Sequence, residues 1–159
     1  MTQLKHVSAE LLRALQQQNL RLAIAESCTG GLICHSITQH PGASDVLNAG
    51  FVTYSNASKT RLLGVPEQLI NKEGAVSEAV ALSMAQGAFD QTNASIAVAS
   101  TGIAGPGGAS AEKPVGTVYL ALKTAHQHVA VLKHFSGNRN AISEQASLAA
   151  LELCLNAIT

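Results

Sequence analysis

The chain has 159 residues, of which 47% are hydrophobic and only 13% charged, and its formal net charge is zero. This length favours a single domain that spans residues 1–159. The zero net charge and the lack of a basic cluster argue against a protein that binds nucleic acid by neutralising phosphates. No apolar run approaches the roughly 20 residues of a membrane-spanning helix, and the first residues lack the apolar core of a signal peptide, so we expect no membrane partner.

The hydrophobic pattern predicts alternating helices and strands in the first half of the chain. An opening helix places leucines and a valine on one face over 4–15, and a short strand over 21–25 follows it. A one-faced helical pattern covers 32–37, and strong strand formers mark a second strand over 51–54. A Ser-Asn pair then caps a helix over 57–63, which stops at a glycine and a proline.

The second half is predicted to contain a helix, three strands and a closing helix. The helix covers 77–89, and a nearly all-apolar strand over 96–99 follows, as is typical of a strand covered on both faces. A short polar turn joins strands over 115–122 and 129–135 into an expected antiparallel hairpin. The last helix follows a Gly-Asn break at 137–138 and carries its apolar residues over 142–153. This order predicts an α/β fold, a three-layer α/β/α sandwich with a mixed sheet.

The stretch Ala-Glu-Ser-Cys-Thr-Gly-Gly at 25–31 lies where the first strand passes into a helix, a common ligand position in α/β proteins. Gly30 and Gly31 allow the backbone to approach a bound group, and the N–H groups of the first helical turn suit an anion such as phosphate. Ser27 and Thr29 place hydroxyls beside that turn. The simpler interpretation is a Ser or Thr helix cap, with glycines for turn geometry.

Hydroxyl groups follow three predicted strands, at Ser27 and Thr29, at Tyr54 and Ser55, and at Ser100 and Thr101. Lys59 lies in the first turn of the helix after Tyr54, where the partial positive charge of the helix N-terminus should lower the pKa of a lysine. Burial would act in the same direction. A lysine with a lowered pKa can activate a neighbouring serine as a nucleophile. A solvated lysine without a role is the alternative.

Cys28 is the nearest rival nucleophile. If the strand persists, Ser27 and Cys28 point to opposite faces, so only one should meet a substrate, and an unpaired cysteine also commonly packs in a core. Arg139 opens the last helix, and its guanidinium suits bidentate phosphate binding unless it is an ordinary surface arginine. No histidine lies at a strand end or in a glycine-rich loop, so no Ser-His-Asp triad is predicted.

The cysteines and histidines predict neither a disulfide framework nor a metal centre. The three cysteines have no CxxC spacing, which is typical of reduced thiols and leads us to expect a cytoplasmic protein. His126 and His128 flank a predicted surface turn without an acidic partner nearby, so we expect no metal there. Low charge and many apolar residues on short helices predict a homodimer.

Several motifs in a fixed order resemble one known family. The matching blocks are 25–31, 51–56 with Lys59, 74–77, 100–108 with 113–118, and 135–139. Together they resemble the CinA C-terminal domain family, the nicotinamide-nucleotide amidases, over nearly the whole chain. The length is similar to that of the stand-alone enzyme, without the additional N-terminal domain of the fused CinA proteins.

The resemblance implies hydrolysis of the carboxamide of nicotinamide mononucleotide to nicotinate mononucleotide and ammonia, without a cofactor. The family's serine–lysine pair falls on Ser27 and Lys59. Its further active-site positions fall on Ser44, Tyr54, Thr101 and Arg139. We add Thr29, Gly30, Gly31 and Gly102 as expected substrate-binding residues. One departure is Ser143, where the family often carries a second arginine, so a phosphate contact from that side is expected to be weaker.

Two alternatives to the serine–lysine amidase remain at this point. One is thiol catalysis by Cys28, and the other is a non-catalytic nucleotide-binding module that assists DNA uptake or repair. The oxyanion of an acyl-transfer reaction would need backbone N–H groups, either from the turn at 29–31 or from the glycine-rich loop at 102–108. Glu26 is expected to bond the backbone of the turn rather than to orient Lys59.

Overall fold

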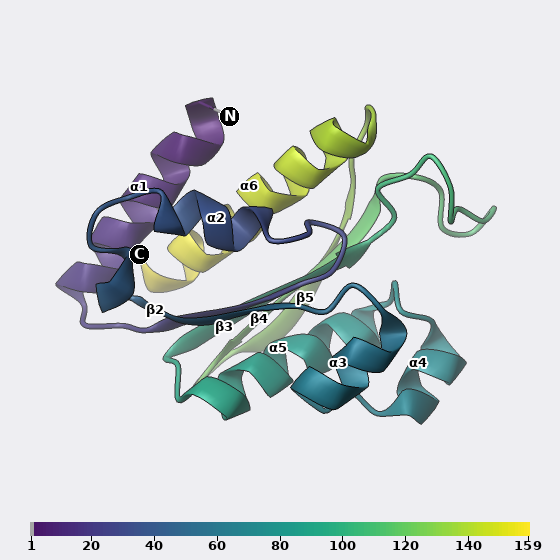
Figure 1. The fold of residues 1–159 in the computed structure, drawn as a ribbon, viewed down its shortest axis with the longest axis horizontal. Helices are drawn as coiled ribbons and strands as arrows, with labels where there is room; N and C mark the ends of the chain where they lie inside the picture. Colours follow the sequence, from purple (N-terminus) through teal and green to yellow (C-terminus); the bar gives the residue numbers. More distant parts are fainter. Residues whose placement is uncertain (1) are drawn as a thin grey trace.

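The computed structural model of this chain describes residues 2–159. Its elements in chain order are α1 Thr2–Gln17, β1 Leu22–Glu26, α2 Leu32–Thr38, the 3₁₀ turn η1 Ala43–Asp45, β2 Leu47–Val52, α3 Asn56–Leu63, α4 Glu67–Glu73, α5 Glu78–Thr92, β3 Ile96–Gly102, β4 Thr117–Thr124, β5 His128–His134 and α6 Arg139–Ile158. The strands form one five-stranded sheet in the order β2-β1-β3-β4-β5 (Figure 1). β1 pairs in parallel with β2 and β3, whereas the β3–β4 and β4–β5 pairs are antiparallel. The predicted mixed sheet and its closing hairpin are therefore confirmed.

Helices cover both faces of the sheet, which confirms the three-layer arrangement (Figure 1). α1, α2 and α6 pack on one face, to which they contribute large aliphatic side chains such as Leu11, Ile33 and Leu151. α3, α4 and α5 pack on the other face, where small side chains such as Ala25 and Ala99 meet α5. Among residues 2–159, no helix combines the length and the hydrophobicity that crossing a bilayer requires.

Three predicted helix starts carry side-chain caps. The capping residues are Ser55 for α3, Ser77 for α5 and Asn138 for α6, and each accepts a hydrogen bond from the backbone N–H three positions later. Such caps satisfy N–H groups that have no partner within the helix. Local sequence therefore defines where these helices begin.

Two elements differ from the sequence-based expectation. β2 occupies Leu47–Val52 instead of 51–54, and α4 forms after Pro66, where no element was predicted. The first residues of β2 have little intrinsic preference for strands and are held by pairing with β1. A Cβ atom at Gly50 would lie 2.1 Å from Cys34 Sγ, so close packing against α2 also selects this position. Tertiary contacts, rather than local propensity, place β2.

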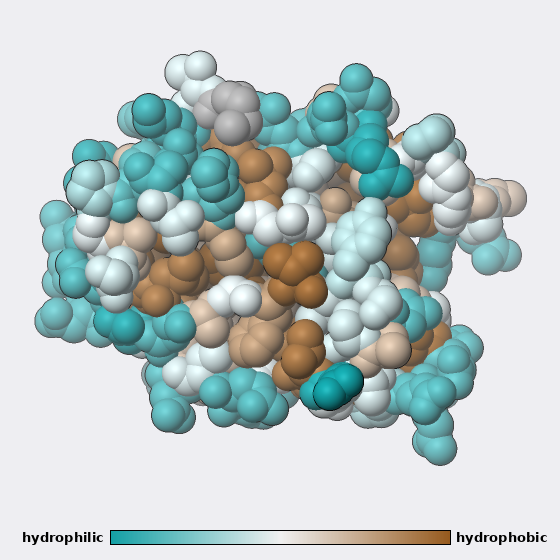
Figure 2. All heavy atoms as spheres, in the orientation of Figure 1, coloured by the Kyte–Doolittle hydropathy of each residue, from teal (hydrophilic) through white to brown (hydrophobic). Residues whose placement is uncertain are grey.

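Apolar side chains reach the surface between the two helical layers (Figure 2). Val52 at the end of β2 and Leu62 on α3 are each close to half exposed. Val129 and Leu132 on β5, the opposite edge strand, are exposed to a similar extent. Both edges of the sheet therefore have apolar side chains in contact with solvent.

The strand register brings three parts of the chain to one end of the sheet. Glu26, the last residue of β1, pairs with Val52 at the end of β2 and with Ser100 near the end of β3. The turn after β1, the segment after β2 and the end of β3 therefore meet where the parallel strands end. This is the position at which α/β sheets commonly bind ligands.

Candidate active site

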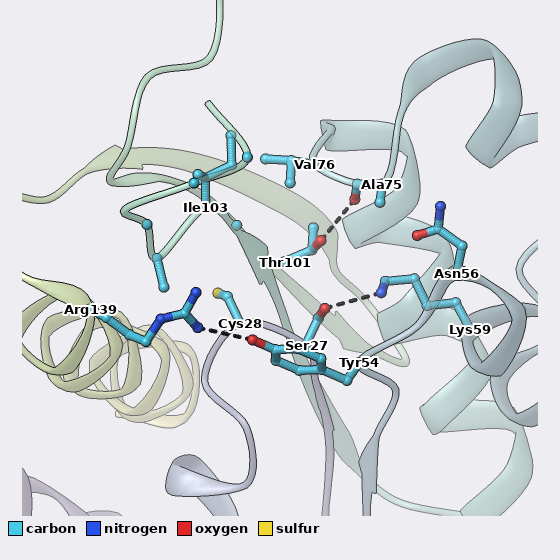
Figure 3. Close-up of a pocket in the computed structure, with 15 residues that line it drawn as sticks. Ser27, Cys28, Tyr54, Asn56, Lys59, Ala75, Val76, Thr101, Ile103 and Arg139 are labelled. Atoms are coloured by element: carbon cyan, nitrogen blue, oxygen red, sulfur yellow. Dashed lines mark hydrogen bonds between the residues drawn. The ribbon is translucent and has the colours of Figure 1, made fainter. Parts of the chain in front are cut away.

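A cleft of about 270 Å³ opens where these strands end, close to the lower limit of the roughly 300–1,000 Å³ typical of small-molecule sites. Its lining comes from five parts of the chain, within 27–28, 54–59, 75–76, 101–108 and at Arg139 (Figure 3). The residues predicted for the site that line it are Ser27, Tyr54, Lys59, Thr101, Gly102 and Arg139. The structure thus brings together side chains that are far apart in the sequence.

Ser27 and Lys59 are in direct contact inside this cleft (Figure 3). Lys59 Nζ donates to Ser27 Oγ at 3.0 Å and to the Thr53 carbonyl oxygen at 2.8 Å. The two side chains are buried, with 7% of Ser27 and 1% of Lys59 exposed to solvent. The Ser27 N–H donates to the Ser100 carbonyl oxygen at 3.0 Å, so the backbone of the turn is fixed to β3.

Burial lowers the pKa of Lys59, because a medium of low polarity disfavours the charged ammonium. Its two hydrogen-bond partners, a hydroxyl and a carbonyl, carry no full negative charge to offset that effect. The predicted direction of the shift is confirmed, with desolvation as the leading cause. A neutral amine at this distance from a serine hydroxyl has the geometry to accept its proton.

Thr101 and the glycine-rich loop after it form another wall of the cleft. Thr101 Oγ1 donates to the Ala75 carbonyl oxygen at 2.8 Å, which fixes the segment 75–76 against the end of β3. A Cβ atom at Gly102 would come within 2.8 Å of the Thr117 carbonyl oxygen, so β3 and β4 can approach this closely only with glycine there. The following glycines present backbone, rather than side chains, to the cleft.

Tyr54 and Arg139 meet at the solvent-exposed side of the cleft (Figure 3). Arg139 Nη1 donates to the Tyr54 hydroxyl at 3.0 Å, and 60% of Tyr54 is exposed. Arg139 begins α6 in one helical layer, and Tyr54 immediately precedes the cap of α3 in the other. A guanidinium has five N–H donors, so this bond leaves Arg139 able to bind an anionic group as well.

The N-terminus of α2 is not an open anion site, which corrects the interpretation of 25–31 as a phosphate-binding turn. The buried Glu26 carboxylate accepts hydrogen bonds from the N–H groups of Gly31, Ile33 and Cys34, at 3.2, 2.9 and 3.0 Å. A carboxylate of the chain itself therefore takes the position where a phosphate was expected. The prediction that Glu26 bonds the backbone of the turn is confirmed.

Thr29, Gly30 and Gly31 form the turn after Ser27 and Cys28 but do not line the cleft, although all three were predicted to bind substrate. The Thr29 hydroxyl is buried and forms a 2.7 Å hydrogen bond with the Ser100 hydroxyl. The Gly30 N–H donates to the Ser27 carbonyl oxygen at 3.0 Å. Gly30 and Gly31 have φ angles of 59° and 103°, which L side chains rarely adopt, so their role in this structure is to form the turn that presents Ser27.

Ser44 is not brought to this cleft. It lies exposed in η1, which precedes β2, whereas the cleft lies beyond the last residues of the parallel strands. Arg21, just before β1, donates through Nη1 to the Asp45 carbonyl oxygen, which fixes η1 at the opposite end of the sheet. Ser44 lies between the matching blocks at 25–31 and 51–56, so the resemblance could not show at which end of β2 this residue lies.

Cys28 lines the cleft beside Ser27, which corrects the expectation that the two side chains point to opposite faces. The alternation of a strand does not extend to them, because β1 ends at Glu26. Burial raises the pKa of the Cys28 thiol to about 12, and the Glu26 carboxylate acts in the same direction. Only the thiolate is an effective nucleophile, so this environment favours Ser27 over Cys28.

Sequence reasoning missed two parts of the lining, Asn56 and the segment 75–76. Both fall within the matching blocks at 51–56 and 74–77. The resemblance therefore pointed to these segments, although no residue type in them suggested a role in the site. Among residues 2–159, no three His, Cys, Asp or Glu side chains gather as metal ligands.

Comparison with known protein families shows to which family this chain belongs. The CinA C-terminal domain family matches residues 4–158. The chain belongs to this family. Among solved CinA structures, the competence/damage inducible protein CihA from Agrobacterium tumefaciens is 40% identical with a TM-score of 0.95, over 98% of this chain and 95% of that one.

Curated members of the CinA family differ in length. The nicotinamide-nucleotide amidohydrolase PncC of Pseudomonas putida is 48% identical over 138 residues, which are 87% of this chain and 86% of that protein. A CinA-like protein of Desulfotalea psychrophila is 47% identical over 141 residues, which are 89% of this chain but 34% of that protein. The chain thus spans about a third of the length of the longer CinA relatives.

Proposed function

We propose that this chain hydrolyses the carboxamide of nicotinamide mononucleotide to nicotinate mononucleotide and ammonia, in pyridine nucleotide salvage. The observation that carries the proposal is the 3.0 Å hydrogen bond between Lys59 Nζ and Ser27 Oγ, buried in a cleft of small-molecule size. The similarity to the Pseudomonas putida amidohydrolase, which extends over most of both chains, supports this choice of substrate.

In the proposed mechanism Ser27 is the nucleophile and Lys59 carries protons. Unprotonated Lys59 Nζ accepts the hydroxyl proton as Ser27 Oγ attacks the carboxamide carbon, and a tetrahedral intermediate forms. The ammonium then protonates the amide nitrogen, the C–N bond breaks, and ammonia leaves an ester on Ser27. Water attacks this ester while Lys59 again accepts a proton, which it returns to Ser27 Oγ as the acid is released.

The negative charge on the carboxamide oxygen requires preorganised donors. The N–H groups of Gly30 and Gly31 already donate to the Ser27 carbonyl oxygen and to Glu26, so they are poor candidates. Thr29, the remaining residue of the turn at 29–31, does not line the cleft, so we assign this role to backbone N–H groups of the glycine-rich loop at 102–108, which does.

We assign the phosphate to the exposed side of the cleft, at Arg139 and Tyr54. Arg139 and Lys59 are the cationic side chains among the residues that line the cleft, and Lys59 is engaged with Ser27. Arg139 is exposed and its guanidinium suits a phosphate group. Binding energy from the phosphate would then position the carboxamide at Ser27.

The test is ammonia release by the purified protein from nicotinamide mononucleotide, nicotinamide riboside and free nicotinamide. We expect rapid release from the mononucleotide and far lower kcat/KM for the two compounds without phosphate. Equal kcat/KM for all three would refute the assigned phosphate contact. Absence of ammonia from all three would refute the amidase and favour a nucleotide-binding module without catalysis.

A further inference from the structure

Lys113 connects two walls of the cleft without lining it. Its Nζ donates to the Val76 carbonyl oxygen at 2.5 Å and to the Glu73 carbonyl oxygen at 3.3 Å. Val76 belongs to the cleft wall, and Glu73 is the last residue of α4. Lys113 itself lies far away in the sequence, on the returning limb of the loop between β3 and β4.

Hydrogen bonds with Ser110 hold the backbone at Lys113 in a position from which the ammonium reaches these carbonyl groups. The Lys113 N–H donates to Ser110 Oγ at 3.1 Å, and the Ser110 N–H donates to the Lys113 carbonyl oxygen at 3.0 Å. Of the two carbonyl groups that the ammonium contacts, that of Glu73 lies at the C-terminus of α4, the negative end of the helix dipole, which favours a cation there. The half-buried ammonium therefore has both orientation and a favourable electrostatic environment.

The other limb of the same loop is part of the cleft. It contains Gly102 to Gly108, the segment to which the carboxamide oxygen is assigned above. The loop is closed at its base, because the Gly116 N–H donates to the Ile103 carbonyl oxygen at 2.8 Å. A movement of Lys113 away from Val76 would consequently shift the loop relative to the segment 75–76.

We propose that Lys113 is a positioning residue that holds the glycine-rich loop against the segment 75–76 and so sets the width of the cleft. This inference rests on the proposed amidase function. Lys113 forms hydrogen bonds to carbonyl groups of the wall and to Ser110, not to Ser27 or Lys59. Its loss should therefore weaken binding of the mononucleotide while the chemical step continues once the substrate is bound.

The test compares Lys113→Met, Lys113→Arg and the control Lys72→Met with the unmodified protein. Methionine keeps an unbranched side chain only one atom shorter and has no N–H donor, whereas arginine keeps both donor and charge. Lys72, exposed on α4 beside Glu73, controls for the loss of one positive charge near the cleft. We expect Lys113→Met to raise KM about tenfold with kcat within about twofold, and the other two variants to stay near the original values.

Hydrogen exchange of the unliganded protein provides a second readout that does not depend on activity. Lys113→Met should speed exchange of the backbone amides in 104–112 and leave those of β3 unchanged. An unchanged KM, a fall in kcat alone, or unchanged exchange in 104–112 would each overturn the positioning role. If the unmodified protein releases no ammonia, the amidase proposal fails, while the exchange measurement still decides whether Lys113 holds the loop.

Discussion

Lys59 is the residue on which the proposed chemistry depends most. A fully buried lysine is unusual, because removing an ammonium from water is costly unless the group is paired or loses its proton. Here the side chain ends between Ser27 Oγ and the Thr53 carbonyl oxygen, and burial lowers its pKa. The environment that makes Lys59 expensive to keep charged also favours its neutral amine, the form that can act as a base.

The first prediction is that Lys59→Arg is nearly as damaging as Lys59→Ala. Arginine keeps the positive charge but does not lose its proton in this pH range, so it cannot accept the proton of Ser27. We expect both variants to reduce kcat/KM for ammonia release by about 10³-fold, as is typical when a general base is removed. An arginine variant within about tenfold of the unmodified enzyme would mean that Lys59 acts only through its charge.

The pH dependence of kcat/KM is an independent check on this prediction. Only the unprotonated amine is active, so kcat/KM should rise with pH through the pKa of Lys59, which burial places below the ordinary lysine range. The rising limb should disappear in Lys59→Arg. A profile of the same shape in both proteins would assign the titration to another group.

At the scale of elements, the short helix α2 determines how the nucleophile is presented. α2 has seven residues and follows the left-handed Gly31, which supplies no side-chain cap. Glu26, from the end of β1, supplies the missing acceptors and so joins the strand to the helix on either side of Ser27. A carboxylate also interacts favourably with the positive end of the helix dipole.

The second prediction is that Glu26→Ala destabilises the protein. The N–H groups of Gly31, Ile33 and Cys34 would lose their acceptor, and we expect the free energy of unfolding to fall by about 2–3 kcal/mol. Glu10→Ala, on the exposed face of α1, is the control and should change it by less than about 0.5 kcal/mol. Urea unfolding measures both; a Glu26→Ala value as small as that of the control would contradict the capping role.

The elements also show what a sequence alone can predict. The cap of α3 at Ser55 and the buried face of α1 follow from local pattern and are confirmed. β2 could not be located this way, because its pairing with β1 outweighs the weak strand preference of its residues. The sequence of the turn at 25–31 fits either a bound phosphate or a carboxylate of the chain at the N-terminus of α2. Only the folded structure shows that the Glu26 carboxylate takes this place.

The candidate site was predictable where chemistry and block resemblance agreed. Ser27, Lys59 and Arg139 were predicted from residue type and position, and all of them line the cleft. Ser44 was placed by resemblance alone, and the structure puts it at the other end of the sheet. Lys113 was not predicted, because hydrogen bonds from a side chain to distant carbonyl groups leave no periodic pattern in a sequence.

At the scale of the whole molecule, the third prediction is that the protein is a homodimer. Both edge strands carry apolar side chains that are close to half exposed, among them Val52 and Leu132, and charged residues are only 13% of the chain. Burying such side chains between two copies is favourable. Light scattering at micromolar concentration should give twice the mass of the chain, and a monomeric mass would contradict the prediction.

The fourth prediction is that activity does not require a metal. Every proton transfer in the proposed mechanism uses the Lys59 amine, and no step needs a metal-bound water. Ammonia release should therefore be essentially unchanged after incubation with EDTA and removal of the chelate. Activity that is lost in EDTA and restored by a divalent cation would overturn the serine–lysine mechanism.

The central claim is that Ser27, rather than its neighbour Cys28, attacks the carboxamide. The most direct test is the rate of ammonia release from nicotinamide mononucleotide by Ser27→Ala, measured beside Cys28→Ser. We predict that Ser27→Ala loses almost all turnover and still binds the mononucleotide, because the proposed phosphate contacts at Arg139 and Tyr54 do not involve Ser27. Cys28→Ser should keep substantial activity, since burial holds the pKa of this thiol at about 12 and leaves it protonated. An inactive Cys28→Ser together with an active Ser27→Ala would contradict the account and make the thiol the nucleophile.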